Sequence, residues 1–269
     1  MTEDNRPIGV FDSGVGGLTV LRALSERMPS ESTLYLGDTA RIPYGTRSPE
    51  VVTRYSVQNG RFLAARGIKL LVVACNTASA VALPALAQAL PIPVIGVIEP
   101  GARAALAQTQ SRRIGVIGTA ATVASGAYVR ALQALDPSVE VWAQACPLFV
   151  PLAEEGWVEG AVPEQVARVY LHGLQKSRID TLILGCTHYP LLRDVIGAEA
   201  GPGVVLVDSA QATAQAVEQL LIEQGALAGV NASATHDFCV TDVPSRFLDV
   251  AGRFFGRPVD HAEGVDIVF

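Results

Sequence analysis

The sequence predicts an α/β protein of two similar domains, each a mainly parallel β-sheet flanked by helices. Apolar runs of strand length alternate with helix-like stretches along the whole chain, which is the pattern of parallel sheets covered by helices. Two short patterns each occur twice, in the same order, which indicates two related halves. Nearly half of the 269 residues are hydrophobic, so the chain can bury a sizeable core as one large domain or two small ones.

The pattern alternates strand and helix throughout, and most of the expected strands are apolar runs of strand length. In the first part we expect strands near 7–11, 33–37, 70–74 and 92–97, with helices near 17–28, 49–65 and 78–90. A second series has strands near 112–117, 139–143, 180–185 and 203–207, with helices near 99–109, 122–135, 163–176 and 190–197. The chain then returns to a helix at 210–224, a strand at 236–240, a helix at 244–252 and a last strand near 257–261.

One uncharged segment, residues 70–98, is long enough to cross a bilayer. Asn76, Pro84, Pro91 and Pro93 interrupt it, and proline inside a helix removes a hydrogen bond and clashes with the preceding turn. Two buried strands joined by a helix explain the segment better than a membrane span does.

The internal repeats set the expected domain organisation. Residues 7–14 resemble residues 113–120, since both are Ile-Gly-Val strands that run into small residues, and residues 71–77 resemble residues 182–188. We place the crossings between the halves near Glu99 and Asp208. The predicted division is therefore 1–98 plus 209–269, carrying Cys75, and 99–208, carrying Cys186.

Composition limits the classes of function. The net charge is −6 and no cluster of Lys and Arg is present, which argues against nucleic-acid binding. The polar, acidic N-terminus lacks the basic start and apolar run of a signal peptide, so we expect a cytoplasmic protein without a membrane segment. None of the four cysteines forms a C-x-x-C pair, so we expect free thiols rather than a zinc ribbon.

The repeated cysteines are the strongest candidate functional residues. Cys75 and Cys186 each follow an equivalent strand, and ligands of α/β sheets bind at the carboxyl ends of strands. Helix N-termini after such turns attract carboxylates and lower the pKa of a thiol, which makes each thiolate a candidate general base. Paired bases facing one substrate suit an enzyme that inverts a carbon centre. Cys146 and Cys239 lack such turns and are interpreted as structural.

Cofactor chemistry has little support. The only two lysines are Lys69, which opens a predicted strand, and Lys176, which ends a predicted helix. Neither is placed to form the Schiff base on which pyridoxal phosphate enzymes depend. The glycine-rich turn that begins at Asp12 fits neither the dinucleotide nor the P-loop pattern. We expect no cofactor. Asp12 is a candidate to hold an ammonium group or polarise a thiol, and Ser13 to bind a carboxylate.

Together these residues resemble the glutamate racemase family, a cofactor-independent branch of the aspartate/glutamate racemases. The resemblance covers nearly the whole chain and rests on residues 11–17, 38–45, 74–78, 146–152 with Glu154, and 184–190. It implies two α/β domains with the active site in the cleft between them. It also implies interconversion of L- and D-glutamate, supplying D-glutamate for peptidoglycan synthesis.

The resemblance also implies roles for single residues. Cys75 would take the α-proton from D-glutamate and Cys186 from L-glutamate, with Asp12, Glu154 and His188 as auxiliary catalytic residues. The positions that match substrate contacts are Asp12, Ser13, Pro43, Tyr44, Gly45, Asn76, Thr77, Thr119, Thr122, Thr187 and His188. Family members are commonly dimers, so we expect a homodimer. Because little precedes Pro7, we expect no activation by a cell-wall precursor.

Three alternatives remain at this point. A sister racemase acting on aspartate or another small acid would share these motifs. A solute-binding module would also have two α/β lobes around a cleft, but it would leave the substrate α-proton in place. A zinc site could be built from Cys75, Cys186 and His188.

Overall fold

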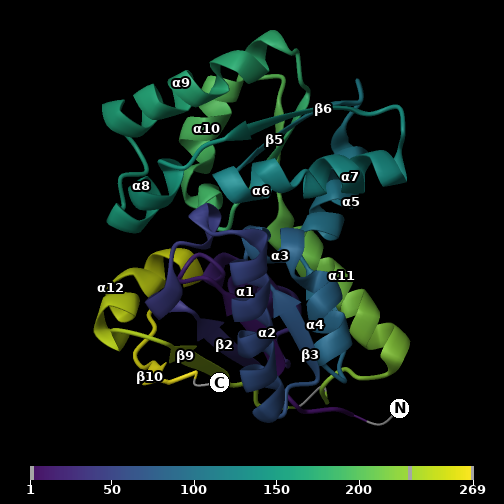
Figure 1. Cartoon of the computed structure of the whole chain (residues 1–269), viewed down its shortest axis with the longest axis vertical. Helices are drawn as coiled ribbons and strands as arrows, with labels where there is room; N and C mark the ends of the chain where they lie inside the picture. The colour runs from purple at the N-terminus through teal and green to yellow at the C-terminus, as the bar shows by residue number, and fades with distance from the viewer. Residues whose placement is uncertain (1–2, 230–231, 268–269) are drawn as a thin grey trace.

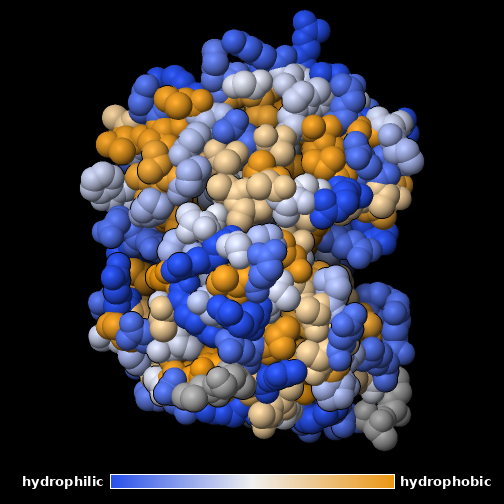
Figure 2. All heavy atoms as spheres, in the orientation of Figure 1, coloured by the Kyte–Doolittle hydropathy of each residue, from blue (hydrophilic) through white to orange (hydrophobic). Residues whose placement is uncertain are grey.

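The computed structural model describes residues 3–229 and 232–267 and contains two parallel β-sheets with helices around them. We call the half built on the larger sheet the first lobe and the half built on the smaller sheet the second lobe. Figure 1 shows the second lobe above the first, with both termini at the far end of the first lobe. Figure 2 shows a notch in the surface between the two lobes on one side of the molecule. The expected fold class is confirmed.

The first lobe carries a six-stranded sheet in the order β10-β9-β2-β1-β3-β4, with every pairing parallel. Residues of the central strands are buried, as expected for a parallel sheet covered on both faces. The strands are β1 (Ile8–Asp12), β2 (Thr33–Gly37), β3 (Leu70–Val73), β4 (Val94–Gly96), β9 (His236–Val240) and β10 (Glu263–Gly264). The helices are α1 (Leu18–Arg27), α2 (Pro49–Ala65), α3 (Asn76–Val81), α4 (Leu83–Ala89), α11 (Ser209–Gln224) and α12 (Pro244–Phe255), with short 3₁₀ turns η1 (Thr39–Arg41) and η2 (Tyr44–Thr46).

The second lobe carries a four-stranded parallel sheet in the order β6-β5-β7-β8. Its strands are β5 (Arg113–Gly118), β6 (Glu140–Ala145), β7 (Thr181–Gly185) and β8 (Val205–Asp208). Its helices are α5 (Ile98–Gln108), α6 (Ala120–Ser125), α7 (Ala127–Leu135), α8 (Phe149–Glu155), α9 (Ala161–Lys176) and α10 (Arg193–Ala200), preceded by the 3₁₀ turn η3 (Tyr189–Leu192). This sheet is therefore inserted between β4 and β9 of the first.

The chain passes between the lobes twice, and the two passages lie close together. It leaves β4 and enters α5, and it later leaves β8 and enters α11. Gly101 of α5 faces Ser209 at the start of α11 so closely that an added Cβ would lie 3.1 Å from the serine Cβ. Helix α11 contacts both α1 and α5, so it packs against both lobes.

Several predicted elements differ from the structure. The helix expected at 78–90 is two helices that meet at Ala82, and the one expected at 122–135 is broken at Gly126, whose φ of +65° ends α6. Helix α8 was not predicted. The last strand expected at 257–261 is wrong, because β10 pairs with β9 only at residues 263–264.

Within the described residues, no helix is long and apolar enough to cross a membrane. The uncharged segment at 70–98 forms β3, α3, α4 and β4 and leads into α5.

Candidate active site

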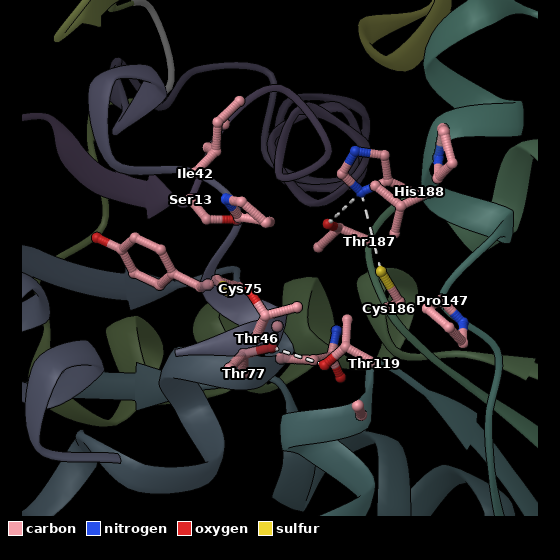
Figure 3. Close-up of a pocket in the computed structure, with 18 of the residues that line it drawn as sticks. Ser13, Ile42, Thr46, Cys75, Thr77, Thr119, Pro147, Cys186, Thr187 and His188 are labelled. Carbon is pink, nitrogen blue, oxygen red and sulfur yellow. Dashed lines mark hydrogen bonds between the residues drawn. The ribbon is translucent and has the colours of Figure 1, made fainter. Parts of the chain in front are cut away.

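A cavity of about 360 Å³ lies between the two lobes and receives side chains from both. Figure 3 shows Ser13 and Cys75 entering it from the first lobe, and Cys186, Thr187 and His188 from the second. All but two of the predicted site residues line it: Ser13, Pro43, Tyr44, Gly45, Cys75, Asn76, Thr77, Thr119, Glu154, Cys186, Thr187 and His188. Asp12 and Thr122 are buried and do not line it.

The position of the cavity follows from the parallel sheets. In each lobe several of the lining residues follow strands, where the carboxyl ends of the strands meet. Ser13 follows β1 and Cys75 follows β3, which pair side by side in the first sheet. Thr119 follows β5 and Cys186 follows β7, which pair in the second sheet. The two sheet edges therefore face one another across the cavity.

Cys75 is held by its own lobe. It is the N-terminal cap of α3, and its Sγ accepts a hydrogen bond from the Ala78 N–H at 3.5 Å. The neighbouring Asp12 is fully buried, and its Oδ2 accepts from the Gly14 N–H at 3.0 Å. Its Oδ1 has no hydrogen-bond partner among the described residues. An unpaired buried carboxylate oxygen is costly, so Asp12 retains capacity to accept a proton or a donor.

The expectation of a lowered thiol pKa is wrong for Cys75 in this state. Burial raises its pKa to about 12, and the charge of Asp12 adds to the increase. Hydrogen bonds from Ala78 and the Ser13 side chain oppose the increase only in part. Desolvation of the thiolate outweighs the helix N-terminus here. Burial likewise raises the pKa of Asp12.

Cys186 lies in a chain of polar groups. Its Sγ lies 3.8 Å from Nδ1 of His188, and Nε2 of the same ring lies 3.0 Å from Oε1 of Glu154 on α8. Burial alone would lower the pKa of His188, but the bonds to Cys186 and Glu154 outweigh it and raise the pKa to about 10. The imidazolium in turn holds the pKa of Glu154 below its usual value, against the effect of burial. A protonated His188 can therefore donate to both neighbours at neutral pH.

Hydroxyl groups from both lobes meet at one side of the cavity. Oγ1 of Thr77 on α3 lies 3.0 Å from Oγ1 of Thr119 and 3.1 Å from that of Thr122. Thr119 and Thr122 are themselves 3.0 Å apart. Beside them, Asn76 accepts a hydrogen bond from the Tyr128 hydroxyl at 2.7 Å, while its buried Nδ2 has no partner among the described residues. These groups can donate hydrogen bonds to an anionic ligand.

The Tyr44 hydroxyl is committed to a buried network of the first lobe. It donates to Oδ2 of Asp38, and Asn59 donates to the same oxygen at 3.2 Å. Oδ1 of Asp38 accepts from Arg41 at 2.8 Å. Burial and the Asp38 charge raise the pKa of Tyr44 above its usual range. The ring of Tyr44, and not its hydroxyl, is therefore the part that can contact a ligand in the cavity.

Two glycines allow the lobes to approach. A Cβ on Gly16 would lie 2.3 Å from Oγ1 of Thr187 and 2.4 Å from Nδ1 of His188. A Cβ on Gly45 would lie 2.8 Å from that of Thr119. At both positions, a turn of the first lobe therefore packs closely against a turn of the second lobe beside the cavity.

The predictions missed an apolar part of the lining, formed by Ile42, Ala120, Pro147, Val150 and Pro151. Each of these residues is adjacent to a predicted site residue or lies in a motif that resembles the family, so position within a motif was the available signal.

Lys69 lies at the opposite end of β3 from Cys75, where its Nζ is 2.6 Å from Oε2 of buried Glu31. In residues 3–229 and 232–267, no group of three or more His, Cys, Asp or Glu could hold a metal, so the zinc alternative has no geometric support.

Comparison with known proteins decides the family. Residues 16–217 match the family model described as Asp/Glu/Hydantoin racemase. The glutamate racemase of Geobacter metallireducens is 57% identical over 251 residues, which is 93% of either chain. The chain belongs to the glutamate racemases of this family.

Solved structures agree in fold over nearly the full length. The crystal structure of a glutamate racemase isoform from Bacillus anthracis has a TM-score of 0.94, 44% identity and coverage of 98% of both chains. That of the Francisella tularensis glutamate racemase in complex with D-glutamate has a TM-score of 0.92, 39% identity and the same coverage. Members of this family are isomerases, and the chain is a racemase by this relationship.

Proposed function

We propose that this chain interconverts L- and D-glutamate with Cys75 and Cys186 as two bases on opposite faces of the α-carbon. The observation that carries the proposal is that two cysteines, one from each lobe, line one cavity in a chain that is 57% identical to a glutamate racemase. The similar structure with bound D-glutamate supports glutamate as the substrate in preference to a solute-binding role or another amino acid.

In the proposed cycle, Asp12 Oδ1 first takes the proton of the Cys75 thiol, whose pKa is raised by burial. The resulting thiolate takes the α-proton of D-glutamate while Cys186 carries a proton. The C–H bond breaks, its electron pair stays on the α-carbon, and an S–H bond forms on Cys75. Cys186 then gives its proton to the opposite face of the carbanion, which yields L-glutamate and a Cys186 thiolate. This protonation state is the one needed for L-glutamate, so the reverse reaction uses the same groups in the opposite order.

The surrounding groups fit these tasks. The protonated His188, held by Glu154, stabilises the thiolate that forms on Cys186, because opposite charges attract strongly in a buried site. The unpaired Asp12 Oδ1, which lies near Cys75 and not in the cavity lining, can hold the proton of the Cys75 thiol. The threonine hydroxyls and the free Asn76 Nδ2 can donate to the substrate carboxylates.

Incubation with L-glutamate in D₂O, without added cofactor, tests the proposal. Optical activity and the α-proton signal are followed together. We expect deuterated D-glutamate to form while the remaining L-glutamate stays protonated early in the reaction. Absence of both inversion and exchange would overturn the assignment, and the same test with aspartate would examine the sister activity.

We also propose that the D-glutamate supplies peptidoglycan synthesis and that the protein acts in the cytoplasm as a homodimer. The family relationship supports the metabolic role, and the four free thiols suit a reducing compartment. The exposed apolar side chains of Leu148 and Val243 are candidates for burial between subunits. Rescue of a bacterium that requires D-glutamate tests the role, and sedimentation equilibrium tests the dimer.

A further inference from the structure

Helix α12 belongs to the first lobe but contacts the polar chain of the second. It follows β9 and precedes β10 in the sequence, and it packs against α1. Figure 1 shows it on the side of the first lobe that faces α8. Two adjacent residues in its last turn, Phe254 and Arg253, contact the two groups that support Cys186.

Phe254 contacts the imidazole of His188. The ring centroids are 5.1 Å apart and the planes meet at 74°, an edge-to-face arrangement between two buried side chains. A histidine held by hydrogen bonds at both nitrogens can still tilt about the line that joins them. The Phe254 ring restricts that tilt, and it also keeps water from the imidazole.

Arg253 holds the end of the helix that carries Glu154. Its Nη1 donates to the Glu154 carbonyl oxygen at 2.6 Å, and its guanidinium lies over Gly156, the C-cap of α8. The last carbonyls of a helix lack partners within the helix and carry partial negative charge, so a guanidinium there fixes the last turn. The side chain of Glu154 projects from this same turn toward His188.

We propose that Phe254 and Arg253 are positioning residues for His188 and Glu154, so that proton transfer at Cys186 depends on the docking of α12. Proton transfer at Cys75 depends on α12 less directly, because its contacts with Ala78, Ser13 and Asp12 lie within β1, α3 and their turns and are linked to His188 only through the charge of Asp12. The inference rests on the proposed racemase function and adds a dependence of one half-reaction on a helix outside the cavity lining.

The test uses two matched pairs of variants. Phe254→Leu is compared with Phe255→Leu, because Phe255 is equally buried on the same helix but contacts Phe238 and His236. Arg253→Gln is compared with Arg257→Gln, because Arg257 is also exposed but stacks on Phe255. Both arginines lie at the surface, so replacing them should not prevent folding. The Arg253 variant therefore tests the proposal even if Phe254→Leu fails to fold.

Isotope effects distinguish positioning from a general loss of structure. L- and D-glutamate have equal free energy, so kcat/KM of any variant must fall equally in both directions. We expect a fall of about 10–100-fold for Phe254→Leu, because a misplacement of about 1 Å in a catalytic group can cost as much as about 10²-fold. A slower Cys186 step should raise the isotope effect with α-deuterated L-glutamate and lower it with α-deuterated D-glutamate. The control variants should leave the ratio of the isotope effect with L-glutamate to that with D-glutamate at the wild-type value.

The proposal is overturned if Phe254→Leu and Arg253→Gln leave this ratio at the wild-type value, whatever their activity. Should the wild-type protein fail to invert glutamate, the racemase assignment falls separately. The α12 contact is then judged by NMR titration of His188. A His188 pKa that changes in Phe254→Leu but not in Phe255→Leu supports positioning, and a His188 pKa that stays at the wild-type value in Phe254→Leu overturns it.

Discussion

The two cysteine turns occupy equivalent places in their sheets but have different surroundings. Cys75 contacts groups of its own lobe, with a buried carboxyl group, Asp12, as its charged neighbour. Cys186 is served by an imidazole–carboxylate pair whose members contact the other lobe through Gly16 and α12. A repeat in sequence therefore places two thiols symmetrically without making their environments alike. The direct partners of Cys75 therefore lie in its own lobe, although Thr77 of α3, the helix that Cys75 caps, contacts the second lobe, whereas the partners of Cys186 are held by contacts with the other lobe.

Replacing either thiol is the strongest test of whether both bases are needed. We expect Cys75→Ser and Cys186→Ser each to lower kcat by about 10³-fold, because loss of a general base costs about 10²–10⁴. Circular dichroism measures the inversion. In D₂O, Cys186→Ser should still exchange the α-proton of D-glutamate and Cys75→Ser that of L-glutamate. Exchange of both enantiomers by one variant would contradict the assignment of faces.

The dependence of Cys186 on the contact between lobes can be broken at Gly16. Gly16→Ala would force its Cβ against Thr187 and His188, so the Cys186 turn must move. We expect kcat to fall by about 10²-fold, since a misplacement of about 1 Å can cost that much. Gly173→Ala in α9, where no atom lies within 4 Å of the added Cβ, is the control. Near-normal activity of Gly16→Ala would show that this approach is not required.

The pH response sharpens the contrast, because only the Cys186 side contains a histidine with a raised pKa. The folded pKa of His188, about 10, lies above its ordinary 6.5, so its charged form stabilises the fold at low pH. That contribution is complete below about pH 6.5 and is lost as pH rises through about 10. We expect Glu154→Gln to lower the pKa of His188, measured by NMR, and to reduce kcat by about 10-fold. An unchanged titration would contradict the role of Glu154.

The smallest expected effect on catalysis lies in the buried network of the first lobe. Tyr44→Phe removes the hydroxyl that donates to Asp38 and keeps the ring that lines the cavity. We expect a loss of about 1–3 kcal/mol in the free energy of unfolding, because a buried carboxylate loses a partner. Activity should change less than with the substitutions of Cys75, Cys186, Gly16 or Glu154 above. Urea unfolding measures the stability, with Tyr55→Phe as the control, since the neighbouring Tyr55 ring is less buried. A large fall in kcat without loss of stability would instead place the hydroxyl in catalysis.

Local patterns predicted most of the fold, because the central strands of both sheets are apolar runs and the turn residues follow them. They failed where a backbone feature outweighed periodicity. Gly126 breaks a helix in the middle of a helix-like run. No element was predicted at residues 149–155, although Pro151 in the first turn of α8 is compatible with a helix, because it removes an N–H that would lack a partner anyway.

The candidate site was predicted unevenly for a similar reason. Residues that follow strands, such as Cys75 and Thr187, are found by their place in the repeat. The contact between Phe254 and His188 joins residues far apart in the sequence, and the predicted helix ended before it reached Phe254. The high pKa of Cys75 results from burial, and the spacing of residues in the sequence does not reveal how deeply this thiol is buried.

The insertion of the second sheet between β4 and β9 has a consequence for synthesis on the ribosome. The second lobe is encoded by one continuous stretch, so it can fold as soon as β8 and its neighbours emerge. The first lobe begins to emerge earlier but must wait for β9, which pairs with β2. Until then the β2 edge is open to pairing with other chains. The part of the protein that is translated first is thus the last to be completed, and a chaperone would be most useful during that interval.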